Sequence, residues 1–312
     1  MATKILVTGG AGYIGSILVP ALLDEGYEVV VVDNFMYQEN SLASSCAHPR
    51  FRVVRSDVRV MDVMVPLLAK ADVVIPLAAL VGAPICDRDP VTATSVNRDA
   101  VVELLRHASK DQGFLVPITN SGYGIGEPGK LCTEESPLRP VSRYGRDKVE
   151  LERVIMDRGN AISFRLATVF GMSPRMRIDL LVNDFTYRAF NDGCIVLFES
   201  HMKRNYLHVR DVSRAFIHGL EEFDRLCDNV YNVGLSDANL SKLELCERIR
   251  RQIPNLTILE APTGSDPDQR DYIVSNAKIE ATGYQPAYSV DDGISELIKG
   301  YTMIRNTRYG NV

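Results

Sequence analysis

The sequence predicts an α/β fold, built on a doubly wound parallel sheet with a smaller, discontinuous α+β lobe. Three observations lead to this prediction. The apolar segment Ile5-Leu6-Val7 has the composition of a buried strand and runs into a turn with four glycines between residues 9 and 15. A second apolar segment, residues 28–32, ends on Asp33. Strand and helix patterns then alternate through the first half of the chain, which is typical of parallel sheets with helices on both faces.

The glycine-rich turn predicts a dinucleotide site. Two spacings fit, Gly10-x-Gly12-x-x-Gly15 and Gly9-x-x-Gly12-x-x-Gly15, and the sequence does not choose between them. In both, glycine lets the backbone approach a pyrophosphate at the start of the helix that follows. Asp33 lies 18 residues after Gly15, near the position of the acid that bonds the adenosine ribose. Because a carboxylate there repels a 2′-phosphate, we expect NAD rather than NADP as the cofactor.

The remaining elements of the first half continue the alternation. We predict, in order, a helix over 16–25, a strand over 52–55, a helix over 62–69, a strand over 72–77, a helix over 96–109, a strand over 115–119, a helix over 144–158 and a strand over 161–166. Ligands of such sheets bind at the carboxyl ends of the strands. The residues at those ends are therefore candidates for a site: Gly9, Asp33, Asp57, Ala79 and Thr119.

Around residue 167 the pattern changes. Residues 171–205 and 236–288 are richer in turns, proline and mixed charge, whereas 206–234 holds a predicted helix (211–223) and a short strand (230–233) that can rejoin the sheet. We therefore expect two units. Residues 1–167 plus 206–234 form the cofactor domain, and residues 168–205 plus 235–312 form a lobe that closes over the cofactor.

Composition and charge exclude several classes of protein. The 312 residues suffice for one large α/β domain and a smaller one, and the formal charge of −5 with scattered basic residues argues against nucleic acid as a partner. The longest aliphatic stretch is the length of a strand, and the N-terminus leads directly into a strand. We therefore expect no membrane span, no signal peptide and a cytoplasmic location. The six cysteines and five histidines show no metal-ligand spacing, so we expect reduced thiols and no bound metal.

Tyr144 and Lys148 are the candidate catalytic pair. They lie four residues apart on a predicted helix, so they share one face. A cation near a phenol stabilises the phenolate and lowers its pKa from about 10. Tyr144 can then accept a hydroxyl proton as hydride leaves the carbon. Thr119, at the end of a strand, can share a hydrogen bond with the same substrate oxygen.

Several segments carry the signatures of one family: residues 8–15, 57–58, 77–79, 119–124, 144–148, 165–171 and 204–212. On these segments the chain resembles the extended short-chain dehydrogenase/reductases, specifically the nucleotide-sugar epimerases and dehydratases, over nearly its whole length. The resemblance implies a Rossmann domain and, as in many members, a homodimer formed through a helix pair. With the glycine motif, it assigns these residues to NAD: Gly9, Gly12, Tyr13, Ile14, Gly15, Asp33, Asn34, Asp57, Val58, Leu77, Ala78, Ala79, Tyr144, Lys148 and Leu166.

The same resemblance implies a nucleoside-diphosphate sugar as the substrate of the second lobe. Arg204 matches the arginine that meets the sugar-nucleotide pyrophosphate, and residues 268–271 resemble a region that supplies a second phosphate or ribose contact. Asn97 matches a family asparagine that is usually structural. The candidate substrate residues are Val81, Gly82, Asn120, Ser121, Arg175, Arg177, Asn183, Arg204 and Arg270.

The chain also departs from the family pattern. Dehydratases place an acid pair directly after the threonine, but Asn120 and Ser121 stand there and neither is a proton donor of matched pKa, so 4,6-dehydration is not expected. Decarboxylating and 3,5-epimerising members need further acid/base groups. Cys86 and His208 are candidates for that role, although both residue types are more often structural at such positions. Thr168 stands where most relatives have asparagine.

The remaining set is sufficient to oxidise a secondary alcohol, which we place at C4 of the sugar. A 4-keto sugar that leaves makes the protein a dehydrogenase; one that turns and takes hydride on its other face makes it a 4-epimerase that restores NAD. Segments 76–84, 119–126 and 173–177 resemble dehydrogenases that oxidise C4 of GDP-linked heptoses in bacterial capsule pathways. We therefore expect a dehydrogenase of this kind, with the 4-epimerase as the alternative. A dehydratase, a small-carbonyl reductase and a non-catalytic NAD sensor rank below both.

Overall fold

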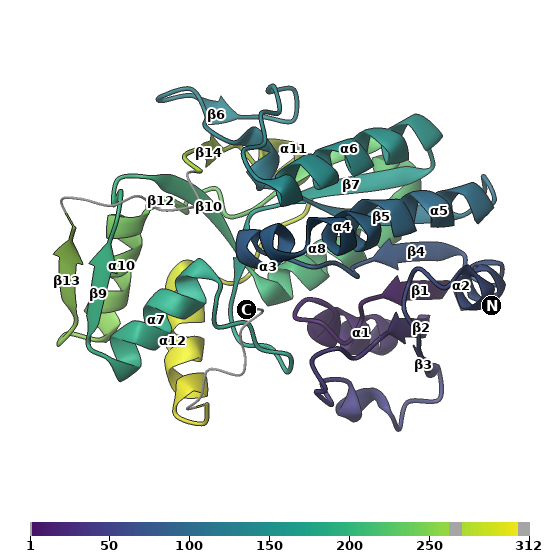
Figure 1. Cartoon of the computed structure of the whole chain (residues 1–312), viewed down its shortest axis with the longest axis horizontal. Helices are drawn as coiled ribbons and strands as arrows, with labels where there is room; N and C mark the ends of the chain where they lie inside the picture. The colour runs from purple at the N-terminus through teal and green to yellow at the C-terminus, as the bar shows by residue number, and fades with distance from the viewer. Residues whose placement is uncertain (1, 262–269, 305–312) are drawn as a thin grey trace.

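A seven-stranded parallel sheet forms the centre of the molecule (Figure 1). The computed structural model describes residues 2–261 and 270–304. From one edge of the sheet to the other, the strands are β3 (Phe51–Arg55), β2 (Glu28–Asp33), β1 (Lys4–Thr8), β4 (Val73–Pro76), β5 (Gly113–Thr119), β7 (Ala161–Leu166) and β11 (Asn229–Val233). All of them pair in parallel. The predicted α/β class is therefore confirmed, and the predicted strand at 230–233 does rejoin the sheet.

Helices cover both faces of the sheet. The side chains of β1 and β2 alternate between two buried clusters, Val7 and Val31 in one and Leu6 and Val32 in the other. The first cluster is closed by α1 (Gly15–Asp24) and α8 (Val209–Glu221), and the second by α2 (Met61–Leu68), α5 (Ala100–His107) and α6 (Arg143–Arg158). The chain runs outward from β1 to β3 and then returns to the other side of β1 at β4. Such a reversal leaves a crevice at the carboxyl ends of the strands, where ligands bind in folds of this kind.

The segment before β5 differs from the predicted helix over 96–109. The helical region begins earlier, with α3 (Ala83–Arg88) and α4 (Pro90–Thr94), and passes through a π-helical turn at Ser95–Asp99 into α5. Asp89 caps α4, because its carboxylate accepts a hydrogen bond from the backbone of Thr92. The π-helical turn directs Asn97 inward, where its amide bonds both the N–H (2.7 Å) and the carbonyl (2.9 Å) of Leu80. Asn97 is thus structural, as the resemblance implied.

The second lobe lies beside the carboxyl ends of the strands (Figure 1). It contains small sheets rather than an extension of the large one: β8 (Thr168–Phe170) with β10 (Lys203–His208) and β12 (Asn239–Ser241), and β9 (Cys194–Leu197) with β13 (Thr257–Glu260). A third short pair, β6 (Leu131–Cys132) and β14 (Ile273–Val274), joins the halves of the chain. The helices α7 (Leu181–Asn191), α10 (Lys242–Gln252) and α12 (Val290–Tyr301) share one apolar core that includes Val182, Leu245 and Leu297.

Local sequence explains where the lobe helices start. Ser241 and Glu244 form a capping box at α10, and Ser289 and Asp292 form another at α12. Each box satisfies two backbone N–H groups that the first turn of a helix leaves unpaired. Short helices α9 (Phe223–Leu226) and α11 (Ala277–Glu280) complete the fold. None of the described helices is long and apolar enough to cross a membrane.

Candidate active site

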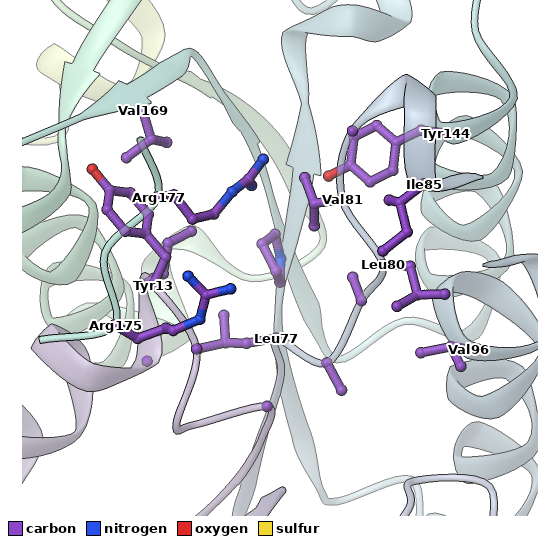
Figure 2. Close-up of a pocket in the computed structure, with 18 of the residues that line it drawn as sticks. Tyr13, Leu77, Leu80, Val81, Ile85, Val96, Tyr144, Val169, Arg175 and Arg177 are labelled. Carbon is purple, nitrogen blue, oxygen red and sulfur yellow. The ribbon is translucent and has the colours of Figure 1, made fainter. Parts of the chain in front are cut away.

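A cavity of about 830 Å³ lies at the carboxyl ends of the strands, between the sheet and the second lobe (Figure 2). All residues that the sequence assigned to NAD line it: Gly9, Gly12, Tyr13, Ile14, Gly15, Asp33, Asn34, Asp57, Val58, Leu77, Ala78, Ala79, Tyr144, Lys148 and Leu166. Thr119 lines it too, together with the substrate candidates Val81, Gly82, Ser121, Arg175, Arg177, Arg204 and Arg270. The fold therefore brings most of the predicted site together in one place.

The glycine-rich turn has the shape that a pyrophosphate requires. Gly9 has a φ of +70°, and a Cβ there would lie 2.5 Å from the backbone of Ala78. At Gly15 a Cβ would lie 2.5 Å from the carbonyl oxygen of Gly10, so neither position accepts a side chain. The turn leads into the N-terminus of α1, whose free N–H groups and dipole favour an anion. These residues fit the diphosphate of NAD.

Asp33 stands at the end of β2 and also holds this turn in place. Its carboxylate accepts hydrogen bonds from the backbone N–H groups of Ala11 (3.0 Å) and Phe35 (2.8 Å). Burial raises the pKa of Asp33, and these two hydrogen bonds oppose the rise. Two carboxylate oxygens offer more lone pairs than two N–H groups use, so Asp33 can still accept from ribose hydroxyls.

Asp57 forms the next part of the cavity wall, after β3. Arg59 is its partner at 2.8 Å, and the hydrogen bond from that guanidinium lowers the pKa of Asp57. The adjacent Val58 is buried and also lines the cavity. The pair therefore presents a fixed polar group beside an apolar surface, which suits an adenine ring and its amino group.

Tyr144 and Lys148 lie at the start of α6, as predicted, but their electrostatics differ from the prediction. Ser142 caps this helix by accepting from the N–H of Gly145 at 3.1 Å. The Lys148 ammonium donates to the carbonyl oxygen of Pro117 at 3.0 Å, and burial lowers the pKa of Lys148 to about 8. Burial also raises the pKa of Tyr144 to about 12.

The predicted lowering of the Tyr144 pKa is therefore not found in the protein alone. Desolvation of the phenolate outweighs every charge around it. The charged groups that do lower this pKa are Arg177, which has the larger effect, and Arg270. Figure 2 shows Arg177 on the wall across the cavity from the Tyr144 hydroxyl.

Thr119 belongs to a chain of polar side chains at the end of β5. Its hydroxyl lies 3.0 Å from that of Ser121 and accepts from the Ser121 N–H at 3.1 Å. The guanidinium of Arg270 donates to the same Ser121 hydroxyl. Arg270 is brought here because its neighbour Asp271 pairs with Ile125 in an isolated parallel bridge. The other two residues of the resembling segment, Asp268 and Gln269, lie outside the described residues.

Two further arginines come from the loop between β8 and α7. The guanidinium of Arg177 forms a two-point ion pair with Asp179. Arg175 is buried, with its guanidinium 3.8 Å from the centre of the Tyr37 ring and 3.8 Å from a carboxylate oxygen of Glu39. This loop therefore contacts the loop that follows β2, and both line the cavity.

Asn183 and Asn120, two predicted substrate residues, are placed differently. Neither lines the cavity, and both side chains are fully buried. Asn183 accepts from the N–H of Gly171 (3.0 Å) and donates to the carbonyl of Arg177 (2.8 Å) and the hydroxyl of Tyr13 (3.2 Å). Its amide is thus committed to holding the Arg177 loop. Asn120 lies in a 3-10 turn at 120–123, and neither atom of its amide has a hydrogen-bond partner among the described residues.

Cys86 and His208, the two candidates for extra acid/base groups, also lie outside the cavity lining. Cys86 is buried and its thiol contacts the carbonyl of Leu80; burial raises its pKa to about 11. His208 lies 2.6 Å from a carboxylate oxygen of Glu296 and stacks on Tyr288. Both are structural in this arrangement.

Sequence reasoning did not single out Tyr37, Glu39 or Asp179, although all three line the cavity. Tyr37 and Glu39 lie on the irregular loop after β2, where no period marks an inward side chain. Asp179 follows Arg177 by two residues, and an acid beside two arginines was the available signal. Only the folded loop shows that this acid pairs with Arg177.

Comparison with known proteins agrees with the fold and the motifs. Residues 5–234 match the model of the NAD dependent epimerase/dehydratase family. The chain is 31% identical to the low-salt glycan biosynthesis protein Agl12 of Haloferax volcanii, over 95% of this chain and 98% of that protein. It is 30% identical to UDP-glucuronic acid decarboxylase 3 of Arabidopsis thaliana, over 93% and 86% of the two chains.

Solved structures agree as well. UDP-glucuronic acid 4-epimerase from Bacillus cereus, in complex with UDP-glucuronic acid and NAD, superposes with a TM-score of 0.86 at 25% identity, covering 96% of this chain and 99% of that one. The dTDP-glucose 4,6-dehydratase of Streptomyces venezuelae, with NAD bound, gives 0.84 at 25% identity, covering 96% and 97%. The glycine turn, Asp33 and the family match together show that this chain belongs to the NAD-dependent epimerase/dehydratase family and uses NAD as its cofactor.

Proposed function

We propose that this protein oxidises the C4 hydroxyl of a nucleoside-diphosphate sugar and releases a 4-keto sugar for surface-glycan biosynthesis. The observation that carries the proposal is the placement of Thr119, Tyr144 and Lys148 on the wall of the NAD cavity, at the end of β5 and the start of α6. In this proposal the sugar nucleotide lies between the cofactor domain (1–167 plus 206–234) and the second lobe (168–205 plus 235–312).

Each of the three residues has a distinct part in the reaction. Bound NAD supplies the hydride acceptor for C4 and, in its oxidised form, a positive charge. Tyr144 takes the proton of the C4 hydroxyl, so that the carbon–oxygen bond becomes a carbonyl as the hydride leaves. Thr119 would hold the same oxygen by a hydrogen bond. Lys148, whose ammonium donates to the carbonyl of Pro117, would supply a cation to hold the ribose of bound NAD. Arg177 and Arg270 favour the phenolate of Tyr144.

The surroundings of Thr119 argue against dehydration. Elimination of water requires an acid next to the sugar carbon that loses its hydroxyl. Asn120 and Ser121 follow Thr119 instead, and the Asn120 amide lies outside the cavity. Within the described residues no histidine or cysteine lines the cavity, so a dedicated acid/base group for 3,5-epimerisation has no candidate of those types there. C4 oxidation needs only the groups already described.

Two arginines are suited to the diphosphate of the substrate. Arg204 and Arg270 both line the cavity, from β10 and from the segment before β14. We propose a GDP-linked heptose as the substrate, on the resemblance of segments 76–84, 119–126 and 173–177 to dehydrogenases of such sugars. The proposal includes a cytoplasmic homodimer that forms through a helix pair. Helices α5 and α6, which pack on the same face of the sheet, are the candidates for that pair.

A 4-epimerase is the second candidate. It is supported by the likeness to the UDP-glucuronic acid 4-epimerase of Bacillus cereus and by a 26% identical relative, a putative UDP-glucose 4-epimerase of Methanocaldococcus jannaschii. The same three residues serve both reactions, because both begin with oxidation at C4. They differ in whether the keto sugar leaves or turns over and takes the hydride back.

Sugar nucleotides carrying deuterium at C4 test the proposal and separate the two candidates. The enzyme is incubated with NAD and a panel of GDP-, UDP-, CDP- and dTDP-sugars that includes heptoses, and nicotinamide absorbance and products are followed. A dehydrogenase gives deuterated NADH and an equal amount of a 4-keto sugar. An epimerase gives the C4 epimer with deuterium retained and no net NADH, which would replace the first proposal by the second. If every sugar keeps its deuterium and neither NADH nor a new sugar is formed from any substrate, both candidates are contradicted.

A further inference from the structure

Arg177 lies on the cavity wall opposite Tyr144 (Figure 2). Its guanidinium forms an ion pair with Asp179, which also lines the cavity. The Nε–Oδ1 distance is 3.2 Å, and a second nitrogen of the guanidinium bonds the other carboxylate oxygen. The Arg177 side chain is 9% exposed and that of Asp179 is 23% exposed, and both residues line the cavity. Because Asp179 neutralises Arg177, this arginine is a poor choice for a diphosphate, which needs net positive charge.

The pair is fixed in place by the protein itself. Asn183 donates to the carbonyl oxygen of Arg177 at 2.8 Å, and accepts from the N–H of Gly171 at 3.0 Å. Its amide also bonds the Tyr13 hydroxyl, which in turn donates to Gly171 at 2.6 Å. Since Tyr13 belongs to the glycine-rich turn, the Arg177 loop is anchored to the cofactor domain. A fixed pair of this kind selects ligands by shape and polarity rather than by adapting to them.

The chemistry of the pair suits hydroxyl groups. A two-point ion pair leaves other N–H donors on the guanidinium and other lone pairs on the carboxylate, side by side and with no net charge. A sugar hydroxyl both donates and accepts hydrogen bonds. Of two neighbouring hydroxyls, one can therefore accept from an N–H of Arg177 while the other donates to the carboxylate of Asp179. A sugar carboxylate has no donor when ionised, and it would meet the negative charge of Asp179.

The position of Arg177 places this pair near the reacting end of the cavity. Among the charged groups around Tyr144, Arg177 has the largest effect in favour of its phenolate. On the Tyr144 side, the cavity wall includes the apolar side chains of Leu80, Val81 and Ile85 (Figure 2). These three residues carry no charge that would compete with the pair for the sugar hydroxyls.

We propose that the Arg177–Asp179 pair binds the hydroxyl groups of the sugar beyond C4 and selects a neutral, polyhydroxylated sugar against a hexuronate. This inference rests on the proposed function and names its substrate class. It also distinguishes this chain from relatives whose names contain glucuronic acid, the decarboxylases of Arabidopsis thaliana and the 4-epimerase of Bacillus cereus.

The test is a set of binding measurements on the NAD-loaded protein by calorimetry. The probes are two matched pairs, UDP-glucose with UDP-glucuronic acid and GDP-mannose with GDP-mannuronic acid, together with free UDP and GDP. We expect the wild type to bind the neutral member of the preferred pair at least about tenfold more tightly than the uronate. Asp179→Asn should reduce that ratio by about tenfold, because it removes the charge that repels the carboxylate and leaves Arg177 unpaired.

Two further variants guard the result against a folding defect. Asp179→Glu keeps the charge and should restore most of the preference. Asp291→Asn removes the acid of an Arg–Asp pair, with Arg248 at 3.2 Å, that lies outside the cavity lining, and should leave the ratio unchanged. Binding of free UDP or GDP should change by less than about twofold in Asp179→Asn, since the pair contacts the sugar and not the diphosphate.

The outcomes separate this inference from the proposed function. Equal binding of neutral and uronate sugars by the wild type overturns the inference and leaves the proposed function standing. The inference is also overturned if Asp179→Asn leaves the ratio of neutral to uronate affinity unchanged. It is overturned as well if this variant loses as much affinity for free UDP or GDP as for the sugar nucleotide. Failure of the wild type to bind any nucleotide sugar or free nucleoside diphosphate overturns both.

Discussion

The ammonium of Lys148 donates a hydrogen bond to the carbonyl oxygen of Pro117 across 3.0 Å. The bond links α6 to β5, the strand that ends at Thr119, and so fixes the two elements that carry the candidate catalytic groups. Lys148 is almost completely buried, at 3% exposure, and burial lowers its pKa to about 8. The arrangement places a costly charge where the proposed reaction uses one.

This cost makes stability depend on pH. The pKa of Lys148 is near 10.5 in the unfolded chain and about 8 in the folded one, so the charged form is disfavoured by folding. The penalty is complete below pH 8 and disappears as pH rises toward 10.5. Lys148→Met removes this penalty. We expect its free energy of unfolding, relative to that of the wild type, to be about 2 kcal/mol higher at pH 7 than at pH 10.

Chemical denaturation of the protein at the two pH values measures this difference. Lys110→Met is the matched control, because Lys110 is exposed and also donates to a backbone carbonyl, that of Arg158 at 3.1 Å. Its stability relative to wild type should be the same at both pH values. An equal pH dependence in the two variants would show that burial of Lys148 does not cause the effect.

Arg177 should shift the pH profile of activity. It is the foremost charged group lowering the pKa of Tyr144, which burial raises to about 12. A base must be deprotonated, so activity is lost as pH falls, and removal of the cation extends that loss to higher pH. We expect Arg177→Met to move the rising limb of kcat/KM against pH upward by about one pH unit. Arg188→Met, which removes an exposed partner of Asp184, should leave the limb where it is; a downward shift in Arg177→Met would contradict the assignment.

Replacement of Asn183 should lower the stability of the protein, because its amide holds the backbone of the Arg177 loop. Asn183→Ala leaves the buried N–H of Gly171 and the carbonyl of Arg177 without their partners. We expect a loss of about 2–4 kcal/mol in the free energy of unfolding, measured by denaturant titration. Asn191→Ala, on the exposed end of the same helix, should cost less than about 0.5 kcal/mol. A variant that kept full stability and lost only affinity for the nucleotide sugar would instead mark Asn183 as a substrate contact.

Asp33 should set the preference between NAD and NADP. Asp33→Asn removes the charge that repels a 2′-phosphate and one of the acceptors that hold Ala11 and Phe35. We expect the dissociation constant for NAD to rise at least about tenfold and that for NADP to rise less, which narrows the preference. Fluorescence titration with NADH and NADPH, which carry the same adenosine ribose, measures the corresponding pair of dissociation constants. Asp24→Asn, at the end of α1, is the control. An unchanged ratio of the two dissociation constants in Asp33→Asn would count against the contact between Asp33 and the ribose.

Much of the cofactor half could be predicted from sequence because its signals are local. Buried parallel strands are short apolar runs, and the glycine turn needs particular residues at particular positions, so both stand out in a linear chain. The strand predicted over 161–166 has the same bounds as β7, and the helix over 144–158 differs from α6 by one residue. Gly9, Asp33 and Thr119 stand at the carboxyl ends of β1, β2 and β5, and Tyr144 stands at the start of α6; all four line the cavity.

The second lobe could not be predicted in the same way. Its strands are short and pair over long distances, as β8 at Thr168–Phe170 does with β10 at Lys203–His208, so no local period marks them. Whether an amide faces a cavity also depends on tertiary contacts. Asn183, in the first turn of α7, turns toward Gly171 and Arg177, whereas Arg177 on the preceding loop lines the cavity. The pKa of Tyr144 depends on burial, which the spacing of Tyr144 and Lys148 does not reveal.

The most direct test of the account is the activity of Tyr144→Phe. This change removes one hydroxyl and keeps the ring that packs beside Leu80 and Ile85. With the nucleotide sugar that the wild type uses, we expect turnover to fall by at least about 1,000-fold while the dissociation constant for NAD stays within about threefold of wild type. That result would establish Tyr144 as the base at an intact cofactor site. Wild-type-like turnover in Tyr144→Phe would contradict the central assignment.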